Sequence, residues 1–371
     1  MAGVGTHAQS LGDLGNLQIH GFATQSLAKS SHNNYLSMDT SGGSLQWTEA
    51  AVAISDQAGS KLRIGVQFHY LVLGDFGGNK VSVDWALGDY RFNRRVGLRA
   101  GKVKIRWGLY NDTQDADPGY LWALLPESVY GIDYRATNLS QMGAELYGNL
   151  RLGKKAGSLD YSAYAGDYYV ASDDGYMEAY KTAGLVFTNQ PWGKTPGFDL
   201  RWNTPLKGLT AGGSLMVYDE KATMADGILR EPLTYWPAYY AQYDCGKLSL
   251  SAQYVRLVQY STTTIEGTPP ETSAQDDRSW FATAAYHATQ KLQVGGYYSR
   301  YLVASALANS DPANFSHEWV ASGRYDFDSS FYGKLEGHYI DGDALGFYTV
   351  DNPDGINSHT NLAVAKLGFV F

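Results

Sequence analysis

The sequence has 371 residues and a formal net charge of −8, and only 18% of its residues are charged, against about 25% in average soluble domains. Its 29 tyrosines, 13 phenylalanines and 9 tryptophans exclude a disordered chain, because disorder requires few aromatic residues and high charge. The absence of any apolar run of about 18 residues excludes ordinary membrane-spanning helices, and the lack of a basic tract excludes nucleic acid as an expected partner. The single cysteine, Cys245, excludes an internal disulfide. A large β protein rich in glycine and tyrosine remains.

Residues 1–15 precede the first predicted strand. Residues 2–8 are mostly small and fit either the tail of a secretory signal or a short disordered leader. The two interpretations stay open, and only the first implies export. Residues 16–371 are expected to form a single domain.

Apolar and polar residues then alternate with a period of two. In 62–72 the even positions are apolar, whereas the odd positions include Arg63, Gln67 and His69. Such a segment is longer than a usual globular strand and suits a tilted membrane strand of about 9–11 residues. The pattern predicts sixteen antiparallel strands, at 16–26, 45–55, 61–73, 80–90, 95–107, 141–152, 158–169, 197–204, 208–219, 236–244, 247–259, 279–287, 291–303, 316–326, 330–340 and 360–371.

Short turns such as 153–157 and 204–208 separate some of these strands, and they contain the Gly, Pro and Thr residues that tight turns favour. Longer polar segments separate the others, at 27–44, 108–140, 170–196, 220–234, 260–277, 304–316 and 341–358. Short turns on one side and long loops on the other are typical of an outer-membrane β-barrel. Segment 180–188 is expected to form a hairpin inside a loop; counted with a partner, it would raise the strand number to eighteen.

The last strand ends on Phe371, with Ala365, Leu367 and Phe369 on one face. This ending resembles the C-terminal insertion signal of Gram-negative outer-membrane barrels, which the assembly machinery reads. It implies a location in the outer membrane, in contact with lipid and lipopolysaccharide. A soluble barrel whose final strand happens to end the chain is the alternative.

The whole pattern resembles the bacterial porins, through the sixteen strands, the terminal Phe371 and the long third loop. Residues 98–111 are also loosely similar to a segment of the phosphate-selective porin O/P group. The resemblance implies a passive diffusion channel for small hydrophilic solutes and ions, with loop 108–140 folded into the lumen as a constriction. It also implies a homotrimer, for which the small-residue faces 50–54 and 282–284 are candidate contacts.

The constriction loop carries both apolar and acidic residues. Segment 118–126 is apolar enough to form a short helix against the barrel wall, and a phase slip near Gly101 is expected to turn Val103, Ile105 and Trp107 toward lipid. The acidic residues expected on the loop are Asp112, Asp115, Asp117 and Glu127. The basic residues expected on the facing wall are Lys102, Lys104 and Arg106. Opposed rings of charge set ion selectivity in channels; alternatively, these basic residues only solvate a wide lumen.

Further basic residues are expected to face the lumen at Arg63, Arg99, Arg151, Arg201, Lys247, Arg324 and Lys334. The expected lumen-facing acidic residues are fewer, namely Asp84, Glu145, Asp160, Asp199 and Glu336. This excess of positive charge predicts a mild preference for anions.

Other functions are weighed against the channel. The sequence contains neither HExxH nor GxSxG, so no enzyme and no cofactor are expected, although a hydrolase with a Ser–His pair on the wall stays open. The acidic residues between 112 and 117 have the spacing of Ca²⁺ ligands but lack the glycine and final glutamate of an EF-hand. A sheath for a cytochrome is a further alternative, and tyrosine-rich loops would suit a channel specific for a saccharide or an aromatic solute.

Overall fold

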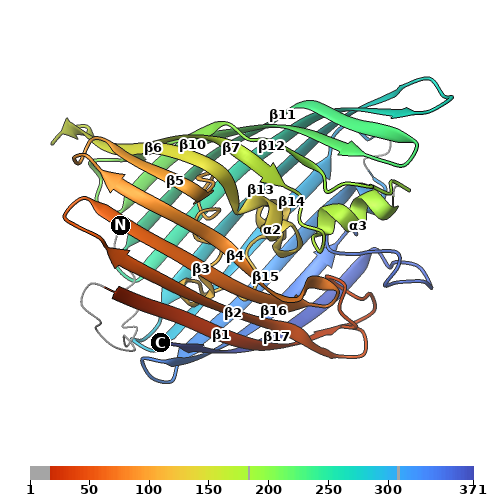
Figure 1. Cartoon of the computed structure of the whole chain (residues 1–371). Coiled ribbons are helices and arrows are strands. Elements are labelled where there is room, and N and C mark those ends of the chain that lie inside the picture. Colours follow the sequence, from red (N-terminus) through yellow and green to blue (C-terminus); the bar gives the residue numbers. More distant parts are fainter. Residues whose placement is uncertain (1–16, 183, 307–309) are drawn as a thin grey trace.

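The computed structural model describes residues 17–182, 184–306 and 310–371; the predicted leader at 1–15 lies outside them. The described chain forms one closed antiparallel barrel (Figure 1). Its seventeen strands occupy sixteen positions, because β8 and β9 lie end to end between β7 and β10. Pro196, which lacks a backbone N–H, lies at this interruption. The predicted sixteen-stranded fold is therefore confirmed.

The strands are β1 Leu17–Ser30, β2 Ser44–Gln57, β3 Leu62–Leu73, β4 Phe76–Arg91, β5 Gly97–Lys104, β6 Ser140–Gly153, β7 Gly157–Tyr169, β8 Trp192–Lys194, β9 Gly197–Asn203, β10 Leu209–Thr223, β11 Gly227–Cys245, β12 Leu248–Ile265, β13 Glu271–His287, β14 Leu292–Val303, β15 Phe315–Asp326, β16 Phe331–Asp341 and β17 His359–Val370. The helices are η1 Asp117–Gly119, α1 Glu127–Tyr130, η2 Ile132–Tyr134, α2 Arg135–Asn138, α3 Gly175–Thr182 and η3 Pro312–Asn314. In the part of the chain described here, none of these helices is long and apolar enough to cross a membrane.

The two faces of the wall differ as the alternation predicts. On β3, Ile64 and Phe68 are exposed on the outside, whereas Gln67 and His69 are buried inside. Around the barrel, many large apolar side chains, such as Leu335 and Trp319, are exposed on the outside. This arrangement is the reverse of that in a water-soluble protein. An apolar outside and a polar inside suit a wall that faces lipid.

The barrel closes between its first and last strands. β1 pairs with β17 from Phe22 opposite Val370 to Ser30 opposite Leu362. Beyond this ladder, Gly21 and Phe371 exchange both backbone N–H···O bonds, each 3.0 Å long. The last residue of the chain is thus part of the seam, and closure leaves the barrel without an open sheet edge.

The prediction of loops at 220–234 and 260–277 is wrong, because both segments are mostly strand. Strands β10 to β13 continue there as long hairpins joined by residues 224–226 and 266–270. These hairpins project beyond the rest of the wall (Figure 1). A strand outside the membrane meets water on its outer face, so it lacks the apolar alternation by which membrane strands are recognised.

The expected loop hairpin at 180–188 is also wrong. Residues 175–182 form helix α3, and Phe187 then makes an isolated bridge with Met224. α3 lies at the end of the barrel that carries the long loops (Figure 1). This end is called the loop end below, and the opposite one the short-turn end.

Candidate channel constriction

The third loop, residues 105–139, leaves the wall and crosses the lumen. β5 ends at Lys104, soon after Gly101, whose φ of +127° is poorly accessible to other residues. Val103, Ile105 and Trp107 are only 1–2% exposed, so the prediction that they face lipid is wrong. The physical reason is that the chain has turned inward, where the alternation of a wall strand no longer applies.

Trp107 is the first anchor of the loop on the far wall. Its ring lies 4.5 Å from that of Trp236 on β11, and its Nε1–H donates to the carbonyl of Trp236 at 2.7 Å. Ile105, Leu109 and Tyr130 belong to the same buried cluster. The loop therefore reaches across the lumen and packs on the opposite wall.

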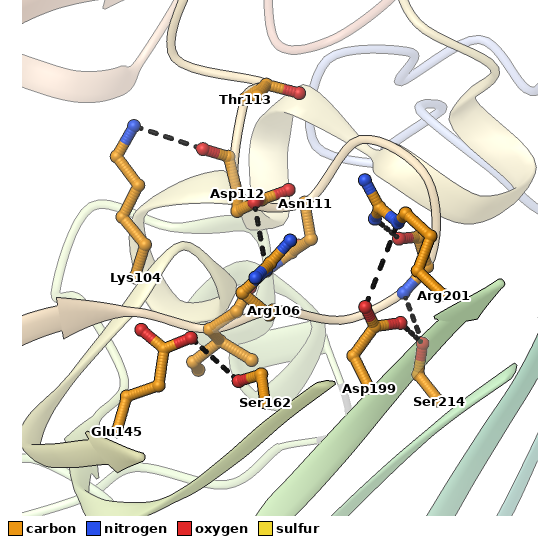
Figure 2. A network of polar contacts seen from close by, with 12 residues as sticks. Lys104, Arg106, Asn111, Asp112, Thr113, Glu145, Ser162, Asp199, Arg201 and Ser214 are labelled. Atoms are coloured by element: carbon orange, nitrogen blue, oxygen red, sulfur yellow. Dashed lines mark hydrogen bonds and ion pairs between the residues drawn. The ribbon is translucent and has the colours of Figure 1, made fainter. Parts of the chain in front are cut away.

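Polar contacts fix the turn after Trp107. Gly108 has a φ of +65°, its N–H donates to Ser214 Oγ at 2.9 Å, and its carbonyl accepts from the Arg201 guanidinium at 3.0 Å. Asp199 in turn accepts from Ser214 and lies 3.8 Å from Arg201 (Figure 2). Arg201 thus faces the lumen as predicted, where it positions the loop backbone.

The basic residues at the start of the loop contact its acidic residues directly. Lys104 Nζ lies 2.6 Å from Asp115 Oδ2 and donates to the Asp112 carbonyl at 3.1 Å. Arg106 Nε lies 3.4 Å from Asp112 Oδ2, and Figure 2 shows both cations directed at this turn. The structure therefore brings together four of the predicted residues, but as close ion pairs and not as opposed charges across an open gap.

Asp117 forms the second anchor, on the last strands. Its Oδ2 lies 3.0 Å from Lys334 Nζ, its Oδ1 lies 2.8 Å from Lys366 Nζ, and Tyr332 donates to it at 2.6 Å. Burial alone would raise the pKa of the Asp117 carboxyl, but the two ammonium groups hold it well below its usual range. This carboxylate remains charged and holds the loop against β16 and β17.

The backbone after Asp117 is hydrogen-bonded to the same wall. Arg324 donates to the carbonyls of Pro118 and Tyr120, and Glu336 accepts from the N–H groups of Ala123 and Leu124, each at 2.9 Å. The predicted helix at 118–126 packs against the wall as expected but is wrong as a helix. Only its first two residues are helical, in η1, because the backbone groups of Tyr120, Ala123 and Leu124 bond to the wall.

The loop returns through Arg135 on α2. Its guanidinium contacts Asp84 on β4, with Nη2 2.6 Å from Oδ2, and the same carboxylate accepts from Gln67. His69 lies between this group and Glu49, 3.0 Å from the glutamate. Loop 105–139 is therefore tied to the barrel at β3–β4, at β9–β13 and at β15–β17.

Two of these anchors are absent from the sequence-based predictions. Lys366 lies between Ala365 and Leu367, which were expected on the lipid face, so strand parity alone would have placed it in the lumen. Arg135 lies inside the loop, where no period exists to assign it a direction.

Other predicted wall residues lie away from the constriction. Arg99 pairs with Asp89 and Glu145, and Arg63 donates to Ser55. The residues nearest the short-turn end include Arg151, which borders a surface hollow with Arg94 and Arg95. Lys247 lies in an exposed turn. The contacts of Arg99, Arg63 and Lys247 among the described residues are with the wall and its turns, not with loop 105–139.

Lys102 lies beside the base of the third loop. It pairs with Ala86 on one side and with Met142 on the other, and its ammonium donates to the carbonyl of Val83. It also lines a cavity to which Asp84 and Arg135 contribute. Its expected role in the constriction stays a prediction.

Glu127 also differs from the prediction that it faces a basic wall. It borders a cavity of about 320 Å³ that contains three further carboxylates and no Lys, Arg or His among its described lining residues. Burial and the nearby carboxylate of Asp133 raise the pKa of Glu127 well above its usual value. This side of the loop is therefore acidic.

The expected Ca²⁺ ligands diverge. Asp112, Asp115 and Asp117 contact Arg106, Lys104 and the lysine pair of the last strands, respectively. Within the described residues, no three His, Cys, Asp or Glu side chains are arranged to hold a metal ion. The three carboxylates therefore do not form a shared site in this arrangement.

No protein-family profile and no curated protein matches the sequence. Solved structures do match along nearly its full length. OmpF of Salmonella typhi, described in complex with daunomycin, has a TM-score of 0.61 at 14% identity and covers 98% of this chain and 100% of its own. An anion-selective porin from Comamonas acidovorans has a TM-score of 0.60 at 11% identity, covering 96% and 99%. OmpT, an outer membrane protein of Vibrio cholerae, has a TM-score of 0.59 at 14% identity, covering 96% and 97%.

The fold of this chain is therefore that of the outer-membrane porins, as the sequence suggested. The identities are low, so the similarity extends to the sixteen-stranded barrel alone.

Proposed function

We propose that this protein is a porin-like channel of a Gram-negative outer membrane, through which small hydrophilic solutes and ions diffuse passively. The observation that carries the proposal is the third loop, which crosses the lumen and is anchored on opposite walls through Trp107 and Asp117. A loop held in this way narrows the lumen at a fixed place.

The channel is proposed to be narrow and to prefer cations. The basic residues at the start of the loop, from which anion preference was expected, lie within ion-pair distance of carboxylates, which cancels most of their field. The cavity beside Glu127 holds carboxylates with no cationic side chain among its described lining residues. Carboxyl groups without a cationic partner accept from cations and repel anions, so this part of the lumen is proposed to favour cations.

Transport without a chemical reaction is part of the proposal. The buried His338 lies 2.7 Å from Glu318 through Nδ1 and 3.1 Å from Glu336 through Nε2. Both ring nitrogens face carboxylates, so this imidazole has no free nitrogen with which to activate a nucleophile. A sheath for a cytochrome is not proposed, since loop 105–139 crosses the space that a threaded partner would need.

The test is the conductance of the refolded barrel in a planar bilayer. Stepwise openings that do not saturate with salt are expected, and the same chain left unfolded in denaturant is the control. Silence from a correctly folded barrel, recognised by its altered migration after heating, would overturn the proposal. Openings in groups of three would support the expected homotrimer, for which the outward Ala50–Ile54 face of β2 is available.

A solute-specific channel is a second candidate. The cavity of about 320 Å³ is lined by six tyrosines and one tryptophan, which suits a site that binds one class of solute.

A further inference from the structure

The cavity beside Glu127 lies between the third loop, the fourth loop (170–191), the eighth loop (342–358) and the wall formed by β10 to β13. The third loop contributes α1, the fourth contributes Tyr176 and Tyr180 of α3, and the eighth contributes Ala344 and Leu345. The cavity is therefore on the loop-end side of the constriction, where a solute entering from that end would meet it first.

Two carboxylates face each other on its wall. Glu220 on β10 and Glu231 on β11 are directly paired in the antiparallel register, and they are only 6% and 4% exposed. Directly opposite residues have Cβ atoms about 4.5–5.5 Å apart, and like charges in such a pair destabilise the sheet. A buried pair of this kind is stabilised either by a proton on one carboxyl group or by a positive charge from elsewhere.

Among the described residues that line the cavity there is no Lys, Arg or His. The neighbouring Lys221 lies on the opposite face, with its ammonium 4.2 Å from the ring of Trp192, and Arg230 is exposed. The hydrogen bonds that the described residues make to Glu220 come from neutral phenols, Tyr168 at 2.9 Å and Tyr180 at 2.6 Å.

Asp277 on β13 gives an independent indication. It lines the same cavity and is 5% exposed. Its Oδ2 accepts from Tyr301 at 2.8 Å and Gln275 at 2.6 Å, whereas its Oδ1 has no partner among the described residues. A buried carboxylate oxygen without a donor is costly, and a bound cation with N–H groups would remove that cost.

The remainder of the lining is aromatic. Tyr218 and Trp236 lie side by side on the wall, with ring centroids 6.5 Å apart, and Tyr134 lines the cavity from the third loop. Aromatic faces attract cations and also cover the apolar body of a solute. Carboxylates and aromatic rings together suit an organic ammonium compound better than a bare metal ion, for which oxygen ligands would have to converge.

We propose that this cavity binds solutes that carry an ammonium group on an apolar or aromatic body. The Glu220–Glu231 pair and Asp277 would accept from the ammonium group, and Tyr218 and Trp236 would cover the body. The inference rests on the proposed channel function only for the route by which the solute arrives.

The test is isothermal titration of the full refolded barrel in detergent. The probe is phenethylammonium; 2-phenylethanol, which has the same body without charge, and 3-phenylpropionate, an anion, are the comparison compounds. Saturable binding of the ammonium compound is expected, with the alcohol at least about tenfold weaker, since a charge-assisted hydrogen bond is roughly twice as strong as a neutral one. The anion is expected not to bind.

The variants E220Q and E231Q are each expected to weaken ammonium binding about tenfold and should fold well, because they remove repulsion. The matched control is D160N, which changes a carboxylate bonded to Asn149 and Asn203 on β7, a strand that contributes only Tyr168 to the cavity, and should bind within twofold of the native barrel. Equal binding of alcohol and ammonium, or native affinity in the E220Q/E231Q double variant, would overturn the inference. A conducting barrel without ammonium binding overturns this inference alone, whereas a silent barrel that binds the probe overturns the channel alone.

Discussion

Lys366 and Asp117 are 249 positions apart in the sequence, yet Nζ of the lysine lies 2.8 Å from Oδ1 of the aspartate inside the barrel. Lys366 also donates to the carbonyl of Ala123 at 3.1 Å, and its ammonium lies 4.1 Å from the ring of Trp47. A residue of the final strand thus fixes a loop from the first half of the chain. The geometry of the constriction depends on this pair.

The first prediction concerns this anchor. In K366M, Asp117 keeps Lys334 and Tyr332 but loses one buried cation, and breaking a buried pair costs about 3 kcal/mol. We expect a lower temperature of heat modification and noisier single-channel currents, as the loop moves. The control is K247M, which removes an exposed lysine from a turn. Unchanged stability in both K366M and D117N would contradict the anchoring role.

The second prediction concerns pH. Asp174 lies directly before helix α3, in the loop between β7 and β8. Its carboxylate accepts from the backbone N–H and the hydroxyl of Thr137 and from the backbone N–H of Tyr176. Burial raises its pKa to about 8 in spite of these donors, and the nearby Asp133 adds to the rise. Between its unfolded pKa of about 3.9 and this value, the ordered loop holds a proton that the opened loop releases. The contribution of Asp174 to the stability of the ordered loop is therefore greatest below about pH 4 and falls as the pH rises toward 8.

We expect hydrogen exchange of residues 171–177, corrected for intrinsic rates, to show more frequent opening at pH 8 than at pH 5. In D174N the difference should largely vanish. Protection that is independent of pH in the native protein would argue that Asp174 titrates normally.

The third prediction concerns selectivity. The E220Q/E231Q variant removes two carboxyl groups from the cavity, so its reversal potential in a KCl gradient should move toward the anion side relative to the native channel. D160N, which removes one luminal charge far from the cavity, should move it less. A native channel that already favours anions would instead support the preference first expected from the sequence.

The fourth prediction concerns the turn at Gly108. An alanine there would adopt a left-handed conformation, and its Cβ would lie 2.5 Å from the Tyr130 hydroxyl and 2.6 Å from the Gln253 amide. We expect G108A to cost about 1–2 kcal/mol from the backbone alone and to shift tryptophan fluorescence by displacing Trp107. G119A is the matched control, because nothing lies within 4 Å of its added Cβ. Similar spectra for the two variants would show that the turn tolerates a side chain.

The fifth prediction concerns the C-terminus. Deletion of Phe371 removes both bonds to Gly21 and the ring contact with Phe369 at 5.9 Å. We expect less assembled protein in cells, through loss of the proposed assembly signal, and a smaller effect on refolding in detergent. F327A, which removes an exposed aromatic ring from a turn, should assemble normally. Equal assembly of both variants would argue against the signal.

The barrel could be predicted because each membrane strand carries its own evidence. On β3 the alternation of Ile64 and Phe68 with Gln67 and His69 is imposed by lipid and water on opposite faces. The rule fails where that contrast ends, as in the outer part of β11, where both faces are wet. It also fails from Val103 onward, since the chain there is enclosed by protein.

The candidate site was predicted only in part. The inward loop was implied by the resemblance to porins, and parity placed several of its polar partners in the lumen, including Arg201, Arg324 and Lys334. The pairing of these groups was not predicted, because the contacts of Asp117 join strands that are distant in sequence. The cavity was missed because its carboxylates come from β10, β11, β13 and α1, and only the closed barrel brings them together.

The seam between β1 and β17 has a consequence for biosynthesis. In a chain that is made from its N-terminus, loop 105–139 precedes Lys334 and Lys366, so its Asp117 anchor forms only after β16 and β17 have been made. The pore can therefore take its final width only when the barrel closes between β1 and β17. A chain that stops before β16 would keep the Trp107 anchor on β11 but lack the Asp117 anchor.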